Sequence, residues 1–197
     1  MNFPITRHYQ RYEYVVEKGW TNGKDIVDIG SDNGYGLYIL SGNAKSVVGI
    51  DPALNRVLDG KNILVGAPVI DSKGERVSMI PAKFEEVDFD RPVDIVTAIE
   101  VLEHVPNPSE FCKRIAEKCS NAFFTTPLAE KTGPTGNADH VAEYSYEDFR
   151  NILEENFEVL EFVFQLSDLS IVQYAHFSGE SRVVTHVVQM AWCKSKR

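Results

Sequence analysis

Residues 24–36 read KDIVDIGSDNGYG, and this stretch decides the fold of the chain. The largely apolar run from Asp25 to Gly30 predicts a buried strand, and the glycine-bearing turn after it leads into an expected helix. Glycine accepts a positive φ and lets the backbone approach a ligand closely. A strand, a glycine turn and a helix in this order are typical of the first unit of an α/β sheet.

Outside this stretch, short apolar runs alternate with helical patterns, and this alternation predicts an α/β fold with a largely parallel sheet. The last two strands are joined without a crossover helix, so we expect them to form an antiparallel hairpin. Ser145, with Asp148 three residues later, is a start signal for the last helix. The expected strands are 25–30, 46–51, 77–81, 93–99, 121–126, 157–165 and 182–193, and the expected helices are 5–19, 34–41, 108–119 and 145–156.

The second expected strand ends in Asp51, which follows Gly30 by 21 residues. An acid at about this spacing binds the ribose hydroxyls of a nucleoside, so the pair predicts a nucleoside-binding crevice. The glycines follow G-x-x-x-G-x-G rather than the G-x-G-x-x-G of dinucleotide binding. Asp28 and Asp32 in the turn would repel a pyrophosphate and attract the ammonium and sulfonium groups of S-adenosylmethionine. An NAD-dependent oxidoreductase is therefore disfavoured.

Five stretches of the chain match one known family in the family's own order. They are KDIVDIGSDNGYG (24–36), VVGID (47–51), AKFEEV (82–87), VDIVTAIEVLEHVPNP (93–108) and FFTTP (123–127). Together they resemble the class I S-adenosylmethionine-dependent methyltransferases. The resemblance implies a Rossmann-like, doubly wound α/β fold, in which a seven-stranded mixed sheet with an antiparallel last strand lies between two layers of helices. A later segment, HVAEYSYEDF (140–149), is similar to one in many members that act on small metabolites or glycans.

The resemblance also implies roles for individual residues in binding S-adenosylmethionine. The acid and glycines of the first turn would line the methionine end, Asp51 would bind the ribose, and Glu100 would lie under the cofactor. The chain departs from the family where Asp32 replaces the middle glycine of the turn. It departs again where Lys83 replaces the acid that usually meets the adenine amino group. Another group must therefore accept the hydrogen bond from that amino group. The expected cofactor residues are Asp28, Gly30, Asp32, Gly34, Asp51, Pro52, Lys83, Phe84 and Glu100.

A Glu-x-x-Glu-His segment follows the fourth expected strand. Glu100, Glu103 and His104 are spaced so that a helical turn would put them on one face. Two carboxylates and an imidazole could bind a divalent metal, and His140 could add a fourth ligand. Certain quinone-pathway O-methyltransferases and small-RNA 3′-end 2′-O-methyltransferases with a similar segment bind metal. The alternative is that these side chains serve the cofactor pocket and packing, since most chains with this segment need no metal.

His104 and His140 are the expected general bases. Histidine side chains ordinarily titrate near neutral pH, which suits the removal of a proton from an acceptor hydroxyl. Glu143 and Tyr144, which follow shortly after His140, could shape the acceptor pocket. The expected reaction is O-methylation of a small polar acceptor such as a sugar, a glycan precursor or a phenolic metabolite, with N-methylation of a small amine left open. The alternatives are metal-assisted 2′-O-methylation of an RNA 3′ end and a non-catalytic, cofactor-binding partner subunit.

The composition of the chain limits the classes of partner and the cellular location that we expect for it. The formal net charge of −9 opposes nucleic-acid binding, which depends on neutralising phosphates. No apolar run approaches the roughly 20 residues of a membrane-spanning helix, and the N-terminus lacks a signal-peptide core, so we expect a cytoplasmic protein. Cys112, Cys119 and Cys193 are expected to be buried thiols, not disulfide partners or zinc ligands.

The chain length fits one domain. We expect a single methyltransferase domain over residues 1–197, with an N-terminal helix in 1–20, a cofactor-binding core in 24–127, and acceptor-side loops and a C-terminal hairpin in 128–197. The sequence leaves the acceptor and the oligomeric state open.

Overall fold

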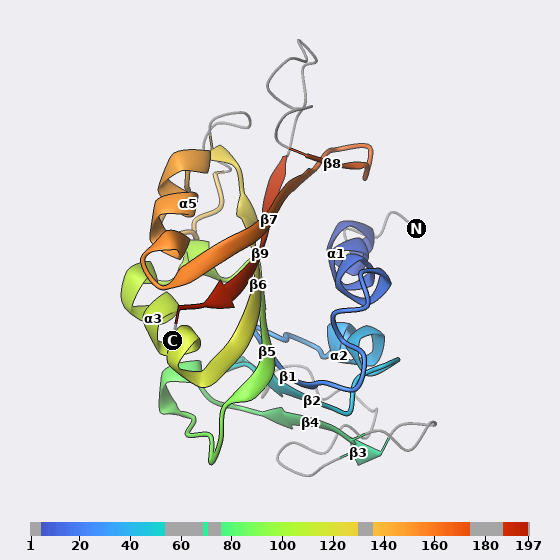
Figure 1. The fold of residues 1–197 in the computed structure, drawn as a ribbon. Coiled ribbons are helices and arrows are strands. Elements are labelled where there is room, and N and C mark those ends of the chain that lie inside the picture. The colour runs from blue at the N-terminus through green and yellow to red at the C-terminus, as the bar shows by residue number, and fades with distance from the viewer. Residues whose placement is uncertain (1–4, 54–68, 71–75, 130–135, 174–186, 197) are drawn as a thin grey trace. The chain divides into compact units, whose positions relative to one another are not determined.

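The computed structural model describes residues 5–53, 69–70, 76–129, 136–173 and 187–196. The chain folds as two compact parts, Met1–Thr97 and Ala98–Arg197. Figure 1 shows strands and helices in both parts.

The strands of the first part lie in the order β3-β4-β2-β1-β5. The strands β1 (Asp25–Ile29), β2 (Ser46–Ile50) and β4 (Arg76–Ile80) are parallel neighbours, and β3 (Val69–Ile70) runs antiparallel to β4. The strand β5 (Val93–Ile99) ends in the second part. Ile29 pairs with Ile50. Gly30 and Asp51, the next residue on each strand, therefore leave the sheet at the same level.

The helices of the first part pack against each other. They are α1 (Ile5–Glu17) and α2 (Tyr35–Leu40), which lie side by side in Figure 1, and a short 3₁₀ helix, η2 (Phe84–Glu86), follows β4. Tyr12 of α1 and Leu37 of α2 are both buried. Within the described ranges, every helix of the protein is too short or too polar to span a lipid bilayer.

The second part is built on antiparallel pairing. Its strands are β6 (Cys119–Pro127), β7 (Phe157–Gln165), β8 (Ile171–Gln173) and β9 (Val188–Ser195), and they lie in the order β6-β9-β7-β8. All three pairs in this order are antiparallel. Its helices are η3 (Leu102–His104, a 3₁₀ helix), α3 (Pro108–Lys118) and α5 (Tyr146–Glu154). Figure 1 shows β9 running between β6 and β7.

The predicted elements are present, with their ends shifted by a few residues. Ser145 caps α5 by accepting a hydrogen bond from the backbone N–H of Asp148 at 3.0 Å, as its start signal predicts. The predicted antiparallel pairing of the last two strands is confirmed in β7 and β9, although residues 182–186 of the predicted last strand lie outside the described residues. The described part of the chain holds nine strands instead of seven, because β3 and β8, at two and three residues, are too short to give a sequence period.

The three cysteines are buried, as predicted. Burial raises the pKa of the Cys112 and Cys193 thiols, so they remain protonated. Their role in the fold is packing.

Candidate functional site

The turn after β1 has the backbone that its sequence predicts. Gly30 and Gly34 have φ angles of 73° and 79°, which glycine adopts at little cost. Asp32, at the position of the family's middle glycine, also has a positive φ, of 45°. The amide of Gly30 donates to the Ile50 carbonyl at 2.8 Å, which anchors the turn to β2.

Asp51 joins two turns at the ends of β1 and β2. One of its carboxylate oxygens accepts from the amide of Asp32 at 2.9 Å, and the other accepts from the amide of Ala53 at 2.7 Å. The residue is 8% exposed, and a carboxylate can accept about four hydrogen bonds. The donor and acceptor chemistry therefore fits a ribose diol. Asp32 is exposed on the same turn and offers a second negative charge.

Asp28 differs from Asp51 because it is completely buried. Tyr12 donates from its hydroxyl to one carboxylate oxygen at 3.0 Å, and Thr97 donates to the other at 2.6 Å. Burial raises the pKa of Asp28 to about 7. The bonds from Thr97 and Tyr12 lower this pKa, and the charge of Asp51 raises it. The carboxyl is therefore poised between its charged and neutral forms near neutral pH.

The other cofactor candidates of the first part lie after β2 and β4. Pro52 is exposed. Lys83 is exposed and its backbone begins η2, where its amide donates to Glu86 at 3.2 Å. Phe84 is buried, and its ring centroid lies 6.1 Å from that of Phe89.

In the second part, Glu100 directly follows β5 and has an unusual backbone conformation. Its φ is 56°, and its amide donates to the carbonyl and the hydroxyl of Thr125, each at 3.1 Å. The Thr125 hydroxyl donates to the Glu100 carboxylate at 2.9 Å. The prediction that a helical turn puts Glu100 on one face with Glu103 and His104 is wrong, because the positive φ of Glu100 precedes the turn and only the latter two lie in η3.

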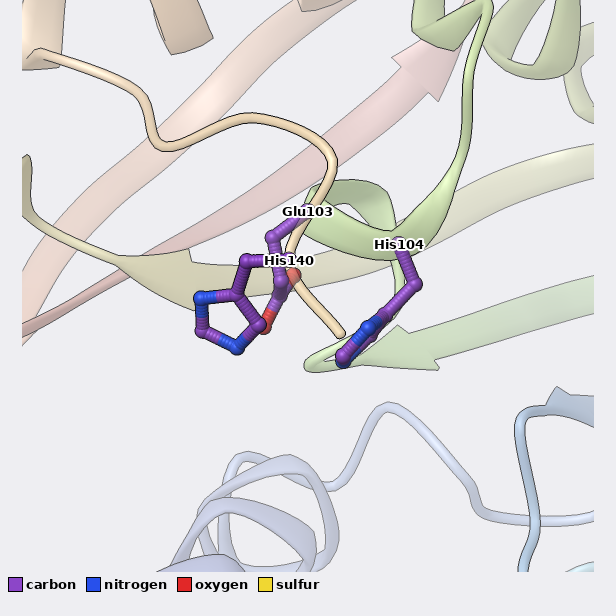
Figure 2. Close-up of side chains that lie close together, drawn as sticks. All are labelled: Glu103, His104 and His140. Atoms are coloured by element: carbon purple, nitrogen blue, oxygen red, sulfur yellow. The ribbon is translucent and has the colours of Figure 1, made fainter. Parts of the chain in front are cut away.

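Glu103, His104 and His140 come together. Their ligand atoms, one from each side chain, lie within 4.8 Å of one another. Figure 2 shows Glu103 and His104 projecting from η3 and His140 approaching them from the later loop. The two imidazole rings are edge to face, with centroids 4.9 Å apart. The amides of Val141 and Ala142 donate to the Glu103 carbonyl at 2.8 and 3.2 Å, which fixes the loop against η3.

Hydrogen bonds set the tautomers of the two histidines. The Nδ1 atom of His104 lies 2.9 Å from the carbonyl of Asp139, and since a carbonyl only accepts, this nitrogen carries the proton. The Nδ1 atom of His140 lies 3.1 Å from a carboxylate oxygen of Glu143, which likewise accepts when ionised. Each neutral ring therefore has its lone pair on Nε2. Such a nitrogen can take a proton or bind a metal.

The side chains around this group are held by the same loop. Tyr144 donates its hydroxyl to the Leu102 carbonyl at 3.2 Å. Burial, followed by the charge of Glu103, raises the pKa of Tyr144 to about 12, so it remains a donor. Glu103 is 1% exposed, which brings a carboxylate into an enclosed setting beside two imidazoles.

A family model described as a methyltransferase domain matches residues 10–163. The chain belongs to this family. The class I methyltransferase family predicted from the sequence is thereby confirmed.

The ubiquinone biosynthesis O-methyltransferase of Nitrosomonas europaea is 30% identical to the chain over 122 residues, which are 59% of this chain and 49% of that protein. The chain spans about half the length of the curated relatives it matches.

Solved methyltransferase structures have the same fold. The N-methyltransferase NodS of Bradyrhizobium japonicum WM9, in complex with S-adenosyl-L-homocysteine, is similar with a TM-score of 0.66 and 14% identity, covering 98% of this chain and 89% of that one. An S-adenosylmethionine-dependent methyltransferase of Clostridium acetobutylicum gives a TM-score of 0.64 at 10% identity, covering 94% and 90%. These likenesses confirm the mixed α/β, Rossmann-like fold.

Sequence reasoning missed the residues that hold the candidates in place. Tyr12 and Thr97 bind Asp28, Thr125 binds Glu100, and the Asp139 carbonyl orients His104. Hydroxyl residues and main-chain carbonyls are too common to mark such partners in a sequence. Glu143 was expected to shape an acceptor pocket, and its contact with His140 gives it a more specific place.

Proposed function

We propose that this chain is an S-adenosylmethionine-dependent O-methyltransferase for a small hydroxylated acceptor. The observation that carries the proposal is a pair of neighbouring histidines. His140 is held at Nδ1 by the Glu143 carboxylate, and His104 is held at Nδ1 by the Asp139 carbonyl, so each neutral ring has its lone pair on Nε2. The family match and the names of the curated relatives support methyl transfer to oxygen.

The first part of the chain supplies the cofactor residues in this proposal. Asp51 accepts from the ribose hydroxyls, and Gly30 and Gly34 give the turn the backbone that a closely approaching ligand needs. Asp28 and Asp32 place negative charge at a turn that takes a cationic ligand. Lys83 and Phe84 border the adenine. The family match, over residues 10–163, includes residues of both parts.

The second part supplies the base. S-Adenosylmethionine, when bound, offers a methyl group on a positively charged sulfur. His140 would accept the acceptor's hydroxyl proton on Nε2, and S-adenosylmethionine would supply the methyl group that the oxygen gains. Glu143 stabilises the imidazolium that forms, because its carboxylate already faces Nδ1. His104, edge-on to His140, is the alternative proton acceptor.

The acceptor is proposed to be a sugar, a glycan precursor or a phenolic metabolite. Phenolic compounds are tested first, because the relatives' names belong to a quinone pathway. Nucleic acid is disfavoured by the formal net charge of −9.

The first test is calorimetric titration of the purified protein with S-adenosylmethionine, S-adenosylhomocysteine and NAD. We expect both adenosyl ligands to bind the wild type, Asp51→Ala to lose that binding, and NAD not to bind. Binding of NAD alone would contradict the proposal and restore the oxidoreductase alternative.

The second test follows methyl transfer to a panel of phenols, sugars and amines by mass spectrometry. We expect methylated phenols or sugars and a rate about a hundredfold lower in His140→Ala. Glu143→Gln keeps the shape of that side chain and should reduce the rate less. If the wild type, His140→Ala and Glu143→Gln all bind the cofactor and none methylates any compound of the panel, the result would instead support the partner-subunit alternative.

A second candidate is metal-assisted methylation of a hydroxyl. The donor set of Glu103, His104 and His140 fits a borderline divalent ion such as zinc or nickel better than magnesium, because two of its three ligands are imidazoles. A divalent ion held there would act as a Lewis acid and favour ionisation of the acceptor hydroxyl. Glu100 is engaged with Thr125 and is not one of these three ligands.

Metal titrations test this candidate. We expect zinc or nickel to raise the melting temperature of the wild type and to leave that of Glu103→Gln unchanged. Activity that survives a chelator, with no thermal shift by any of these ions, would exclude the metal. A metal-dependent protein would then be offered RNA with a free 3′ end, and methylation of that RNA would favour the RNA 2′-O-methyltransferase alternative.

A further inference from the structure

The buried carboxylate of Asp28 is held by a residue of the N-terminal helix. Tyr12, on α1, donates to one carboxylate oxygen at 3.0 Å, and its side chain is 3% exposed. Thr97, on β5, donates to the other oxygen at 2.6 Å. Each oxygen of a fully buried acid thus receives one hydroxyl donor. A buried carboxylate without such donors would be strongly disfavoured in its charged form.

The glycine turn is shaped to accept the same tyrosine. A Cβ atom at Gly36 would lie 2.3 Å from Cζ of Tyr12, so only glycine leaves room for this ring. The ring of Tyr35 lies edge-on to Tyr12, with centroids 5.7 Å apart. The last glycine of the G-x-x-x-G-x-G pattern therefore serves the docking of α1. This is a second observation, independent of the hydrogen bond, that links Tyr12 to the cofactor turn.

We propose that Tyr12 is a positioning residue of the cofactor site, which orients the Asp28 carboxylate and makes the affinity for adenosyl ligands depend on α1. The proposal rests on the proposed function, in which the turn binds S-adenosylmethionine. Tyr12 acts through Asp28 and is not assigned a contact with the ligand. Its hydroxyl favours the charged form of Asp28, which a cationic ligand also favours.

The electrostatics of this group support a measurable effect near neutral pH. Burial raises the pKa of Asp28 to about 7, while the bonds from Thr97 and Tyr12 lower it. The other groups that act on the pair are Asp51 after β2, Tyr35 of α2 and Arg11 of α1. Burial, and then the charge of Asp28, raises the pKa of Tyr12 well above its usual value, so Tyr12 stays protonated and donates throughout this range.

The experiment compares wild type, Tyr12→Phe and the control Tyr14→Phe. Tyr14 lies on the same helix but packs edge-on against Trp20, with ring centroids 5.9 Å apart, and has no bond to Asp28. Two quantities are measured across pH 5.5–8.5: the carboxyl-carbon NMR titration of Asp28 in the free protein, and the Kd for S-adenosylhomocysteine. We expect Tyr12→Phe to raise the Asp28 midpoint by about one pH unit and to weaken binding about fivefold to tenfold near pH 7.5. Tyr14→Phe should match the wild type in both.

A second variant reaches the same contact from its other side. Gly36→Ala should push the Tyr12 ring away from Asp28 and produce the same shift and loss of affinity. Adding Tyr12→Phe to it should change little more, because the hydroxyl is already displaced. Thermal unfolding is recorded for each variant, so that loss of affinity in a folded protein is separated from loss of the fold.

The outcomes separate this inference from the proposed function. A wild type that binds the ligand, together with a folded Tyr12→Phe whose Asp28 midpoint and Kd are those of the wild type, would overturn the role of Tyr12. A wild type that binds neither S-adenosylmethionine nor S-adenosylhomocysteine would overturn the cofactor proposal itself. A raised Asp28 midpoint with weakened binding supports the inference.

Discussion

Strand β1 carries two aspartates, three residues apart, whose surroundings are opposite. Asp25, at the amino end, accepts bonds from the hydroxyl of Ser46 at 2.7 Å, Arg91 at 2.6 Å and Lys45 at 2.9 Å. The bond from Ser46 holds the pKa of Asp25 well below its usual range. Arg91 and Lys45 add to this effect, and burial opposes it.

Asp28, at the carboxyl end, receives hydroxyl donors from Tyr12 and Thr97 and is completely buried, and burial raises its pKa to about 7. At Asp25 the bonds from Ser46, Arg91 and Lys45 outweigh burial and keep the carboxylate charged, whereas at Asp28 burial outweighs the hydrogen bonds and leaves the carboxyl able to change its charge. The carboxyl ends of the strands are also where ligands bind in parallel α/β sheets. In the proposed function, one strand would therefore use the same residue type for stability at one end and for cofactor binding at the other.

The largest expected effect comes from Asp28→Asn, which removes the charge and keeps a side chain of the same shape. Since the folded-state pKa of Asp28 is raised, its contribution to stability is present below about pH 4 and is lost as pH rises through about 7. The variant should therefore be more stable than the wild type at pH 8, by roughly 4 kcal/mol at most. It should also bind S-adenosylhomocysteine about tenfold more weakly or worse.

Urea unfolding and calorimetry at several pH values measure both changes. Opposite signs for stability and affinity mark a residue kept for function. If Asp28→Asn loses stability at pH 8 and keeps its affinity, Asp28 is a structural residue like Asp25, and the comparison fails.

Asp25→Asn should give the reverse result with a smaller size. The folded-state pKa of Asp25 is depressed, so its stabilising contribution is present at neutral pH and is lost as the solution is acidified below about pH 4. Lys45 and Arg91 are 62% and 65% exposed, and this exposure reduces what their ion pairs with Asp25 contribute to the free energy of unfolding. We expect a loss of about 1 kcal/mol at pH 7 in urea unfolding and an unchanged Kd for S-adenosylhomocysteine. A higher Kd would mean that Asp25, at the amino end of β1, also affects ligand binding.

The sequence predicts the strand that carries the two aspartates and the turn that follows it, but not the charge state of either aspartate. The glycine turn, the strands and Asp51 follow from apolar runs, glycine spacing and the distance of 21 residues from Gly30. Which of the acids in β1 is charged depends first on the burial of Asp28 and on the bond from Ser46 to Asp25. Tyr12, Thr97 and Arg91 contribute next, and they lie 16, 69 and 66 residues from the aspartates they bind. Such partners are set by packing, and single-chain periodicity carries no record of them.

The cluster of Glu103, His104 and His140 shows the same limit on what a sequence pattern can predict. The sequence offers Glu103, His104 and His140 as candidates together, and in the structure their ligand atoms lie within 4.8 Å of one another. Helical spacing wrongly added Glu100, because the chain leaves β5 through a positive φ before η3 begins. A spacing rule holds only where the backbone is regular, and the end of a strand is where regularity stops.

The smallest expected effect is that of Lys45→Met, which removes one exposed cation from Asp25 and keeps the length of the side chain. The hydrogen bonds from Ser46 and Arg91 remain, so the loss should be a few tenths of a kcal/mol at low ionic strength. Salt should abolish it, since at about 1 M the screening length is only about 3 Å. Melting temperatures of the variant and the wild type at low and high salt measure this. The gain from Asp28→Asn should persist in salt, because Asp28 is buried away from the ions. Equal salt sensitivity at the two positions would mean that burial does not separate the two aspartates.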